Sequence, residues 1–206
     1  GHALPLEWDL SRRAAFPALL SRIQDWAGDV DILVNNSGGP PPSPATDVRD
    51  DLWHGQFDAM VLSLMQLTSL VLPAMRRRGW GRIITSTSSG VVTPIPNLAV
   101  SNALRMTLIG WSKTLAAEVA ADGVTVNVVL PGRISTARIA QLDQARAERE
   151  QRSLEDIILA STSSIPARRY GKPEEYADAV AFLASTRASY ITGSMVRVDG
   201  GLISSI

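Results

Sequence analysis

The chain contains no cysteine and only two histidines, His2 and His54. The lack of cysteine excludes disulfide scaffolds, thiolate metal sites and cysteine nucleophiles. Two histidines that lie so far apart in the sequence do not form a histidine-rich metal site, so no metal site is expected. Neither histidine has a credible partner for a serine hydrolase, and no Gly-x-Ser-x-Gly motif is present. A chain without cysteine is typical of a reducing compartment, and we expect a cytoplasmic protein.

An excess of charge of one sign is also missing, because 20 basic residues balance 20 acidic ones. A neutral chain has no overall field to attract nucleic acid or an anionic membrane surface. The most apolar stretch, Met60 to Met75, is shorter than a bilayer span and contains Ser63 and Thr68. It is therefore interpreted as a buried helix. We expect neither a nucleic-acid partner nor a membrane partner.

Hydrophobic residues make up 45% of the 206 residues, which is enough for one sizeable core, and a single domain over 1–206 is the simplest organisation. Strand-like and helix-like patterns alternate along it. Strands are predicted at 30–34, 82–87, 124–130 and 194–198, and helices at 50–78, 98–121 and 173–183, with an earlier helix that has Ser11 as its N-cap and ends at Gly28. This alternation predicts a parallel sheet covered by helices on both faces, that is, a three-layer, Rossmann-like, doubly wound α/β fold.

Three loops follow predicted strands and are rich in small or polar residues: Asn35 to Gly38, Ser86 to Gly90, and Pro131 to Thr136. In open parallel sheets, ligands bind outside the carboxyl ends of the strands. These loops are therefore the candidate binding site. Residues 135–164 are polar and follow no chemical pattern, and we expect them to form a substrate lid. The arginine run Arg76 to Arg78 is interpreted as a solvated helix end rather than as a phosphate site.

Five motifs occur in order along the chain. They are Asp9-Leu10; Asn35-Asn36-Ser37-Gly38; Gly81-Arg82-Ile83-Ile84 leading to Ser88; Pro131-Gly132-Arg133-Ile134-Ser135-Thr136; and Ile191-Thr192-Gly193 with Val198-Asp199-Gly200-Gly201. Each motif is short, but their order and spacing together resemble the short-chain dehydrogenase/reductase family. The resemblance is greatest to its β-ketoacyl carrier-protein reductase-like members, and it covers almost the whole chain.

The resemblance implies an oxidoreductase that uses NAD or NADP to interconvert a small-molecule carbonyl and alcohol. The adenine would lie against Asp9 and Leu10. The implied cofactor-binding residues are Asp9, Leu10, Asn35, Asn36, Ser37, Gly38, Arg105, Pro131, Gly132, Ile134 and Thr136. The resemblance also implies a homodimer or homotetramer formed through the helices at 50–78 and 98–121.

The catalytic positions depart from the family pattern. In this family a tyrosine phenol transfers the proton, a lysine four residues later lowers the pKa of the phenol and holds the ribose, a serine polarises the carbonyl, and a helical asparagine completes a relay. The stretch Ile109 to Ala116 sets the alignment, which places Ser101 at the tyrosine, Arg105 at the lysine and Met60 at the asparagine. Only Ser88 matches the family residue.

The implied catalytic residues are therefore Ser88, Ser101 and Arg105. A serine hydroxyl donates a hydrogen bond but is a far weaker acid than a phenol, and Arg105 keeps the positive charge of the lysine. Each residue also has a structural alternative: Ser88 could satisfy backbone groups at the strand end, Ser101 could face a helix carbonyl, and Arg105 could lie on a solvated face. The three tyrosines lie beyond this helix and none has a lysine four residues later, while Lys113 lies two turns past Arg105.

Two functions remain open at this point. The first is an oxidoreductase of this class with altered catalytic residues. The second is a catalytically inactive relative that acts by binding dinucleotide or by assembly. The glycine-rich turn that holds the pyrophosphate in such folds does not occur in these residues, which therefore lack the first β-α-β-α segment of the expected fold. We expect that the native protein has an additional N-terminal segment; the alternative is that another chain or a rearranged sheet edge compensates for it. Without the strands of that segment, the strand at Val30 to Val34 would be an exposed apolar edge, and Leu4 to Leu10 would have no strand to pair with.

Overall fold

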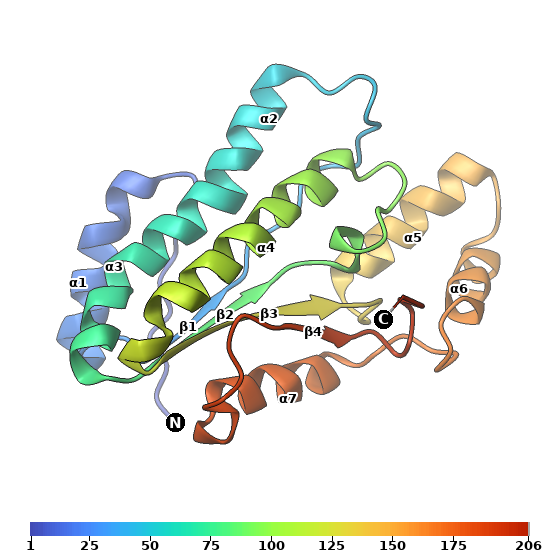
Figure 1. Cartoon of the computed structure of the whole chain (residues 1–206). Coiled ribbons are helices and arrows are strands. Elements are labelled where there is room, and N and C mark those ends of the chain that lie inside the picture. Colours follow the sequence, from blue (N-terminus) through green and yellow to red (C-terminus); the bar gives the residue numbers. More distant parts are fainter. Residues whose placement is uncertain (206) are drawn as a thin grey trace.

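Four short strands form one parallel sheet, and the computed structural model describes residues 1–205 (Figure 1). The strands are β1 (Ile32–Asn35), β2 (Gly81–Ser86), β3 (Val124–Pro131) and β4 (Met195–Val198). They pair in the order β1-β2-β3-β4, and every pair is parallel. All four carboxyl ends therefore lie at one edge of the sheet.

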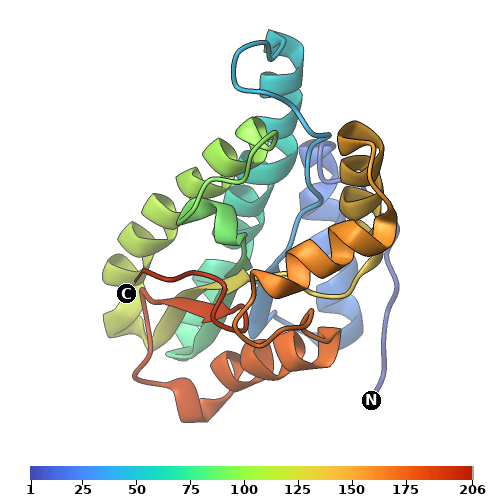
Figure 2. The same cartoon turned by 90° about the vertical axis from the view of Figure 1, so that its right-hand side faces the viewer.

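Helices cover both faces of this sheet, as Figures 1 and 2 show. On one face lie α4 (Ala99–Val119) and a continuous helical run that consists of α2 (Asp50–Phe57), a π-helical turn (Asp58–Leu62) and α3 (Ser63–Arg78). On the other face lies α7 (Pro173–Ala184), which contacts β2, β3 and β4. The predicted three-layer, doubly wound architecture is confirmed.

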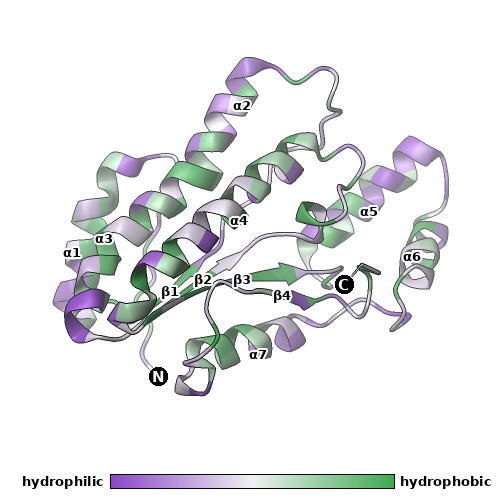
Figure 3. Ribbon diagram, in the orientation of Figure 1, coloured by the Kyte–Doolittle hydropathy of each residue, from purple (hydrophilic) through white to green (hydrophobic). Residues whose placement is uncertain are grey.

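The helical run Asp50–Arg78 is long and apolar enough, by length and composition alone, to cross a membrane. Part of this apolar surface is buried in the core. Val71 and Met75 belong to a core cluster with the sheet and with the end of α4, whereas Met60 and Leu64 belong to a second cluster with the start of α4. These four residues follow helical spacing, so they lie along one face of the run, and this face is buried. Figure 3 shows hydrophobic segments along the sheet and its flanking helices.

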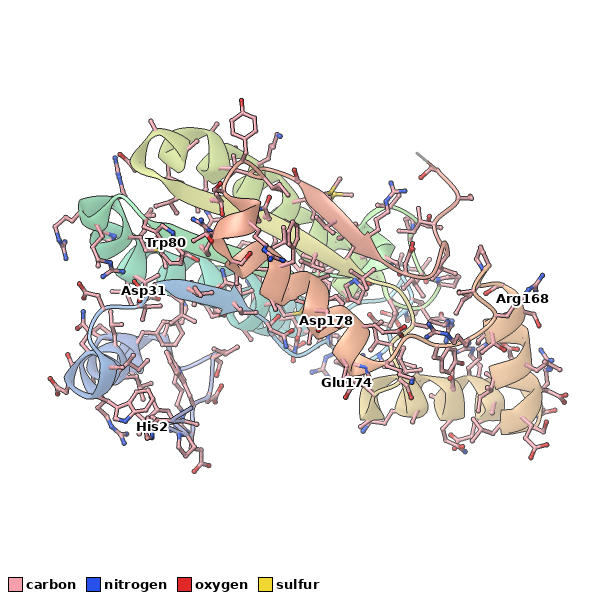
Figure 4. All side chains as sticks on the ribbon, turned by 90° about the horizontal axis from the view of Figure 1, so that it is seen from below. His2, Asp31, Trp80, Arg168, Glu174 and Asp178 are labelled. Atoms are coloured by element: carbon pink, nitrogen blue, oxygen red, sulfur yellow. The ribbon has the colours of Figure 1, made fainter. Side chains whose placement is uncertain are left out.

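The arginines at the end of α3 pair with aspartates. Arg76 Nε lies 2.6 Å from Asp122 Oδ2. Arg78 Nη1 lies 3.2 Å from Asp29 Oδ2, and Arg78 Nη2 lies 2.8 Å from Asp31 Oδ1. Asp31 lies at the amino end of β1 (Figure 4), which is opposite the edge where the strands end. The run is thus a charged helix end, as the sequence indicated, and not part of the candidate site.

Strand β1 is the edge of the sheet and is more exposed than the continuous apolar pattern predicted. Ile32 and Val34 expose 42% and 47% of their surface. A continuous apolar run such as Val30 to Val34 is typical of a parallel strand that is buried on both faces, and that interpretation is wrong here. The expected exposed apolar edge is confirmed. The extended segment Leu4 to Leu10 forms no strand, since it has no pairing partner. Ser11 is not an N-cap either: a 3-10 turn precedes α1 (Phe16–Ala27), whose N-cap is Ala15.

Residues 135–164, the expected substrate lid, form two helices, α5 (Ala137–Glu150) and α6 (Leu154–Ser163), which pack against each other beyond the carboxyl ends of the strands (Figure 1). The Ser153 side chain caps α6 by accepting a hydrogen bond of 3.1 Å from the Asp156 N–H. A segment whose sequence follows no chemical pattern is thus a helical pair in the structure.

Candidate active site

Arg105 on α4 connects the loops that follow β1 and β2. Its Nε donates to Ser101 Oγ at 3.3 Å, its Nη1 to the Ser86 carbonyl at 3.4 Å, and its Nη2 to the Gly38 carbonyl at 3.1 Å. These four residues are called the Arg105 cluster below. The structure thus unites two of the loops singled out in the sequence with the two substituted catalytic positions. Since Arg105 is only 9% exposed, it does not lie on a solvated face.

The charge of Arg105 has no carboxylate partner among residues 1–205. Burial lowers the pKa of its guanidinium, the nearby phenol of Tyr176 raises it, and the positive charge of Arg138 lowers it. Its partners are a hydroxyl and two carbonyl oxygens, which satisfy three of the five N–H donors that an arginine carries. A buried guanidinium with two remaining donors is suited to stabilise negative charge or to bind hydroxyl groups.

Ser101 is also buried, with 9% of its surface exposed. Its oxygen accepts the bond from Arg105, and the hydroxyl donates to no helix carbonyl within residues 1–205. The hydroxyl hydrogen is therefore available to donate to a ligand. The alternative in which Ser101 faces a helix carbonyl does not hold.

Ser88 follows β2 and is half-buried. Its Oγ accepts a hydrogen bond of 3.1 Å from the Gly90 N–H and thereby caps a 3-10 turn. Asn102 on α4 fixes this loop, because its Nδ2 donates to the Ile95 carbonyl at 2.9 Å. A side chain at Gly90 would lie 2.3 Å from Asn102 Oδ1, so only glycine fits there. Ser88 thus has the structural role considered above, while its own O–H remains able to donate.

The Asn35 to Gly38 loop leaves β1 beside this cluster. Asn35 is buried, and its Nδ2 donates to Thr68 Oγ1 at 3.0 Å, which ties the loop to α3. Ser37 is 8% exposed, and its hydroxyl has no hydrogen-bond partner among the described residues. Asn36 and Gly38 are exposed. A buried hydroxyl without a partner is uncommon in folded proteins.

The Pro131 to Thr136 loop lies at the same edge, after β3. The Gly132 N–H donates to the Val198 carbonyl at 2.9 Å, and a side chain at Gly132 would lie 2.6 Å from the Asp199 Cα. Ile134 is buried, and Thr136 is exposed directly before α5. The loop is therefore held against the end of β4.

Asp9, Leu10 and Lys113 form no hydrogen bond or ion pair with the Arg105 cluster within residues 1–205. Asp9 is exposed and accepts hydrogen bonds from the backbone and side chain of Ser11, which together lower the pKa of its carboxyl group. Lys113 donates to the Gly193 carbonyl at 3.0 Å and so does not replace a catalytic lysine.

Met60 occupies the π-helical turn between α2 and α3 and is 2% exposed. It packs with Val100 and Leu104 on α4, so its side chain fills the core beside Ser101. Single π-helical turns within α-helices occur frequently at functional sites. The sequence analysis gave no sign of this turn, because a one-residue widening of a helix does not alter its hydrophobic pattern visibly.

Sequence analysis also missed Tyr176 and Arg138. Tyr176 on α7 faces the sheet, and its phenol lies 2.7 Å from Ser86 Oγ, whereas Glu174 and Asp178 lie on the exposed side of α7 (Figure 4). Arg138 on α5 donates from Nη2 to the Pro40 carbonyl at 2.9 Å. The family pattern, a tyrosine and a lysine four residues apart on one helix, does not point to either residue, because Tyr176 lies on α7 and Arg138 lies on α5.

Comparisons with known proteins show which proteins this chain resembles. Residues 1–203 match the family model described as Enoyl-(Acyl carrier protein) reductase. Nodulation protein G of Azospirillum brasilense is 38% identical over 196 residues, which are 95% of this chain and 75% of that protein. The 3-oxoacyl-[acyl-carrier-protein] reductase FabG of Escherichia coli strain K12 is 40% identical over 191 residues, 92% of this chain and 73% of the relative.

Two solved structures are closely similar. YwfH, an NADPH-dependent reductase involved in bacilysin biosynthesis, has a TM-score of 0.91 at 29% identity and covers 98% of this chain and 78% of its own. A variant of actinorhodin polyketide ketoreductase with NADPH has a TM-score of 0.89 at 31% identity, over 94% of this chain and 75% of its own. The parallel sheet and its flanking helices are thus shared with these reductases.

Proposed function

Because the chain belongs to the short-chain dehydrogenase/reductase family and resembles its 3-oxoacyl-carrier-protein reductases, we propose that it is an NAD(P)-dependent oxidoreductase of a carbonyl/alcohol pair, with altered catalytic residues. The observation that carries this proposal is the contact of the Arg105 guanidinium with Ser101 Oγ and with the loops after β1 and β2. A cation and a hydroxyl are thereby held together at the edge where ligands bind in such sheets. We expect the protein to act in the cytoplasm.

The residues at this edge fit the nicotinamide half of a dinucleotide. Ser37 and Thr87 each bury a hydroxyl without a partner among the described residues, in the loops after β1 and β2. Such hydroxyls are able to form hydrogen bonds with a polar ligand. The residues proposed to hold NAD or NADP are Asp9, Leu10, Asn35, Asn36, Ser37, Gly38, Arg105, Pro131, Gly132, Ile134 and Thr136.

In the proposed mechanism, Ser88 and Ser101 donate hydrogen bonds to the carbonyl oxygen of the substrate. When bound, the nicotinamide supplies a hydride to a carbonyl carbon or accepts one from an alcohol. Arg105 stabilises the negative charge that develops on the substrate oxygen. Because a serine hydroxyl is a weaker acid than a phenol and Met60 cannot relay a proton, the proton comes from Ser101, from Ser88 or from water, and the rate is about 10²–10⁴ lower than with a tuned donor.

Titration of NADH and NADPH fluorescence with the protein, followed by assays on a panel of ketones, tests the proposal. We expect saturable binding and slow turnover that the Ser88→Ala substitution reduces further. Binding without turnover would instead support the second function, a catalytically inactive relative. Absence of NADH and NADPH binding would overturn the proposal.

We further propose that the protein forms a homodimer or homotetramer through the helical region 50–78 and the helix at 98–121. Phe57 and Met106 support this, since they expose 37% and 49% of their surface on α2 and α4. A Met106→Arg substitution should shift the mass measured by analytical ultracentrifugation towards the monomer. An unchanged mass would place the interface elsewhere.

A further inference from the structure

Two arginines from different helices meet at the loop after β1. Arg105 on α4 donates from Nη2 to the Gly38 carbonyl at 3.1 Å, and Arg138 on α5 donates from Nη2 to the Pro40 carbonyl at 2.9 Å. A Cβ atom at Gly39, between these carbonyls, would lie 3.9 Å from Arg105 Nη2 and 3.4 Å from Arg138 Nη2. Both guanidinium groups therefore reach the same small space, which the absence of a side chain at position 39 keeps open.

The positive charge at this point is not balanced within residues 1–205. Neither Arg105 nor Arg138 forms an ion pair there, whereas Arg133 on the neighbouring loop lies 2.9 Å from Asp143. Arg105 is 9% exposed, so its charge is largely removed from water. Buried charges in proteins are normally paired, and two cations that face one space repel each other. An anion at this space would relieve both costs.

Both side chains keep hydrogen-bond donors for such an anion. Arg105 uses one donor on each of its three nitrogens, which leaves one N–H on Nη1 and one on Nη2. Arg138 uses one N–H group, which donates to the Pro40 carbonyl. Its side chain is exposed and therefore free to adjust. Arginine N–H groups form short, strong bonds with carboxylate and phosphate oxygens.

The position of this pair relative to Ser101 indicates what carries the anion. Arg105 Nε lies 3.3 Å from Ser101 Oγ, the proposed donor to the reacting carbonyl. An anionic group bound to Arg105 and a carbonyl group bound to Ser101 would therefore be close enough to belong to one small molecule. Resting on the proposed function, we propose that Arg105 and Arg138 bind the carboxylate of a short oxo-acid substrate, one or two bonds from the carbonyl carbon that is reduced.

The test compares each acid with its neutral ester in the wild-type protein and in the Arg138→Gln variant. The pairs are pyruvate with methyl pyruvate, and 3-oxobutanoate with ethyl 3-oxobutanoate. A hydrogen bond to a charged group contributes about 1.5–3 kcal/mol, so the variant should raise KM for the preferred acid by roughly 10- to 150-fold. It should leave KM for the ester within about twofold. Arg149→Gln on the same helix, which removes an exposed arginine, is the matched control.

Two further measurements, of NADPH affinity and of acid binding, distinguish this proposal from its alternatives. NADPH affinity, measured by fluorescence, should not change in Arg138→Gln; if it falls while the acid and ester respond equally, the oxyanion belongs to the cofactor and the proposal is wrong. Binding of each acid to protein loaded with NADP⁺, measured by calorimetry, needs no turnover. Acid binding that depends on Arg138 without any reduction would retain the anion site and overturn the redox function. Turnover of ester and acid with equal KM would overturn the anion site alone.

Discussion

The phenol oxygen of Tyr176 lies 2.7 Å from Ser86 Oγ, although 90 residues separate them in the sequence. Burial raises the pKa of the Tyr176 phenol, while the hydrogen bond with Ser86 and the charge of Arg105 lower it. Ser86 also gives its carbonyl to Arg105. The contact thus connects α7, on one face of the sheet, to the Arg105 cluster on the other.

The Tyr176→Phe substitution should lower the free energy of unfolding by about 0.5–1.5 kcal/mol, because it removes the phenol that pairs with the Ser86 hydroxyl. Urea denaturation provides the measurement. Tyr190→Phe is the control, since Tyr190 is fully exposed and should change nothing. The double variant with Ser86→Ala should lose less than the sum of the two single changes. Additive losses would show that the two hydroxyls do not interact.

Restoring the family residues in the double variant Ser101→Tyr with Arg105→Lys should raise kcat for ketone reduction. A phenol beside an ammonium group is a better proton donor than a serine hydroxyl, and the gain should be about 10²–10⁴-fold. NADPH consumption measures it. The matched control replaces Ser101 with Phe and Arg105 with Lys, which adds similar bulk without the hydroxyl. Equal rates in the two double variants would mean that other parts of the site are also altered.

Asp143 joins α5 to the loop after β3, and the Asp143→Ala substitution should destabilise this region. The Asp143 side chain is 3% exposed; it lies 2.9 Å from Arg133 Nη1 and accepts a bond of 2.7 Å from the Tyr170 hydroxyl. Removing one partner of such a pair leaves a charge without compensation. Because Arg133 is 26% exposed, water replaces part of the interaction, and we expect a loss of about 2–4 kcal/mol.

Chemical denaturation of Asp143→Ala measures this loss, and Asp156→Ala, at an exposed position on α6, is the control. Faster amide hydrogen exchange confined to α5 and α6 would locate the effect in this helical pair. A stability equal to that of the control would show that the buried carboxylate is replaceable there.

The sequence predicts much of the fold because helices and strands leave periodic hydrophobic patterns. The strand at 124–130 is buried on both faces and matches β3 within one residue. The pattern fails where tertiary context decides. Val34 belongs to an equally apolar run, but it is 47% exposed because no further strand of residues 1–205 pairs with β1.

The candidate site could be predicted only in part, for a similar reason. Ser88 follows the end of one strand, and Ser101 and Arg105 lie one turn apart on one helix, where Arg105 Nε donates to Ser101 Oγ. Arg138 and Tyr176 reach the Arg105 cluster from α5 and from α7. Local sequence does not encode which side chains of separate helices meet, since this depends on how the helices pack around the sheet.

The contribution of Glu175 to stability should disappear in acid. Hydrogen bonds from Arg169 and from the Lys172 backbone N–H lower the pKa of Glu175 from its ordinary value of 4.5 to about 2. A carboxyl group whose pKa is lower in the folded state stabilises that state above the pKa of the unfolded chain, and this contribution is lost as the pH falls through the folded pKa. Glu175→Gln should therefore lower the melting temperature at neutral pH, and the difference in melting temperature between variant and wild type should shrink between about pH 4.5 and pH 2.

Glu174→Gln is the matched control, because Glu174 is exposed in the same first turn of α7 and forms no ion pair within residues 1–205. A difference that is independent of pH would mean that Glu175 acts through its uncharged contacts.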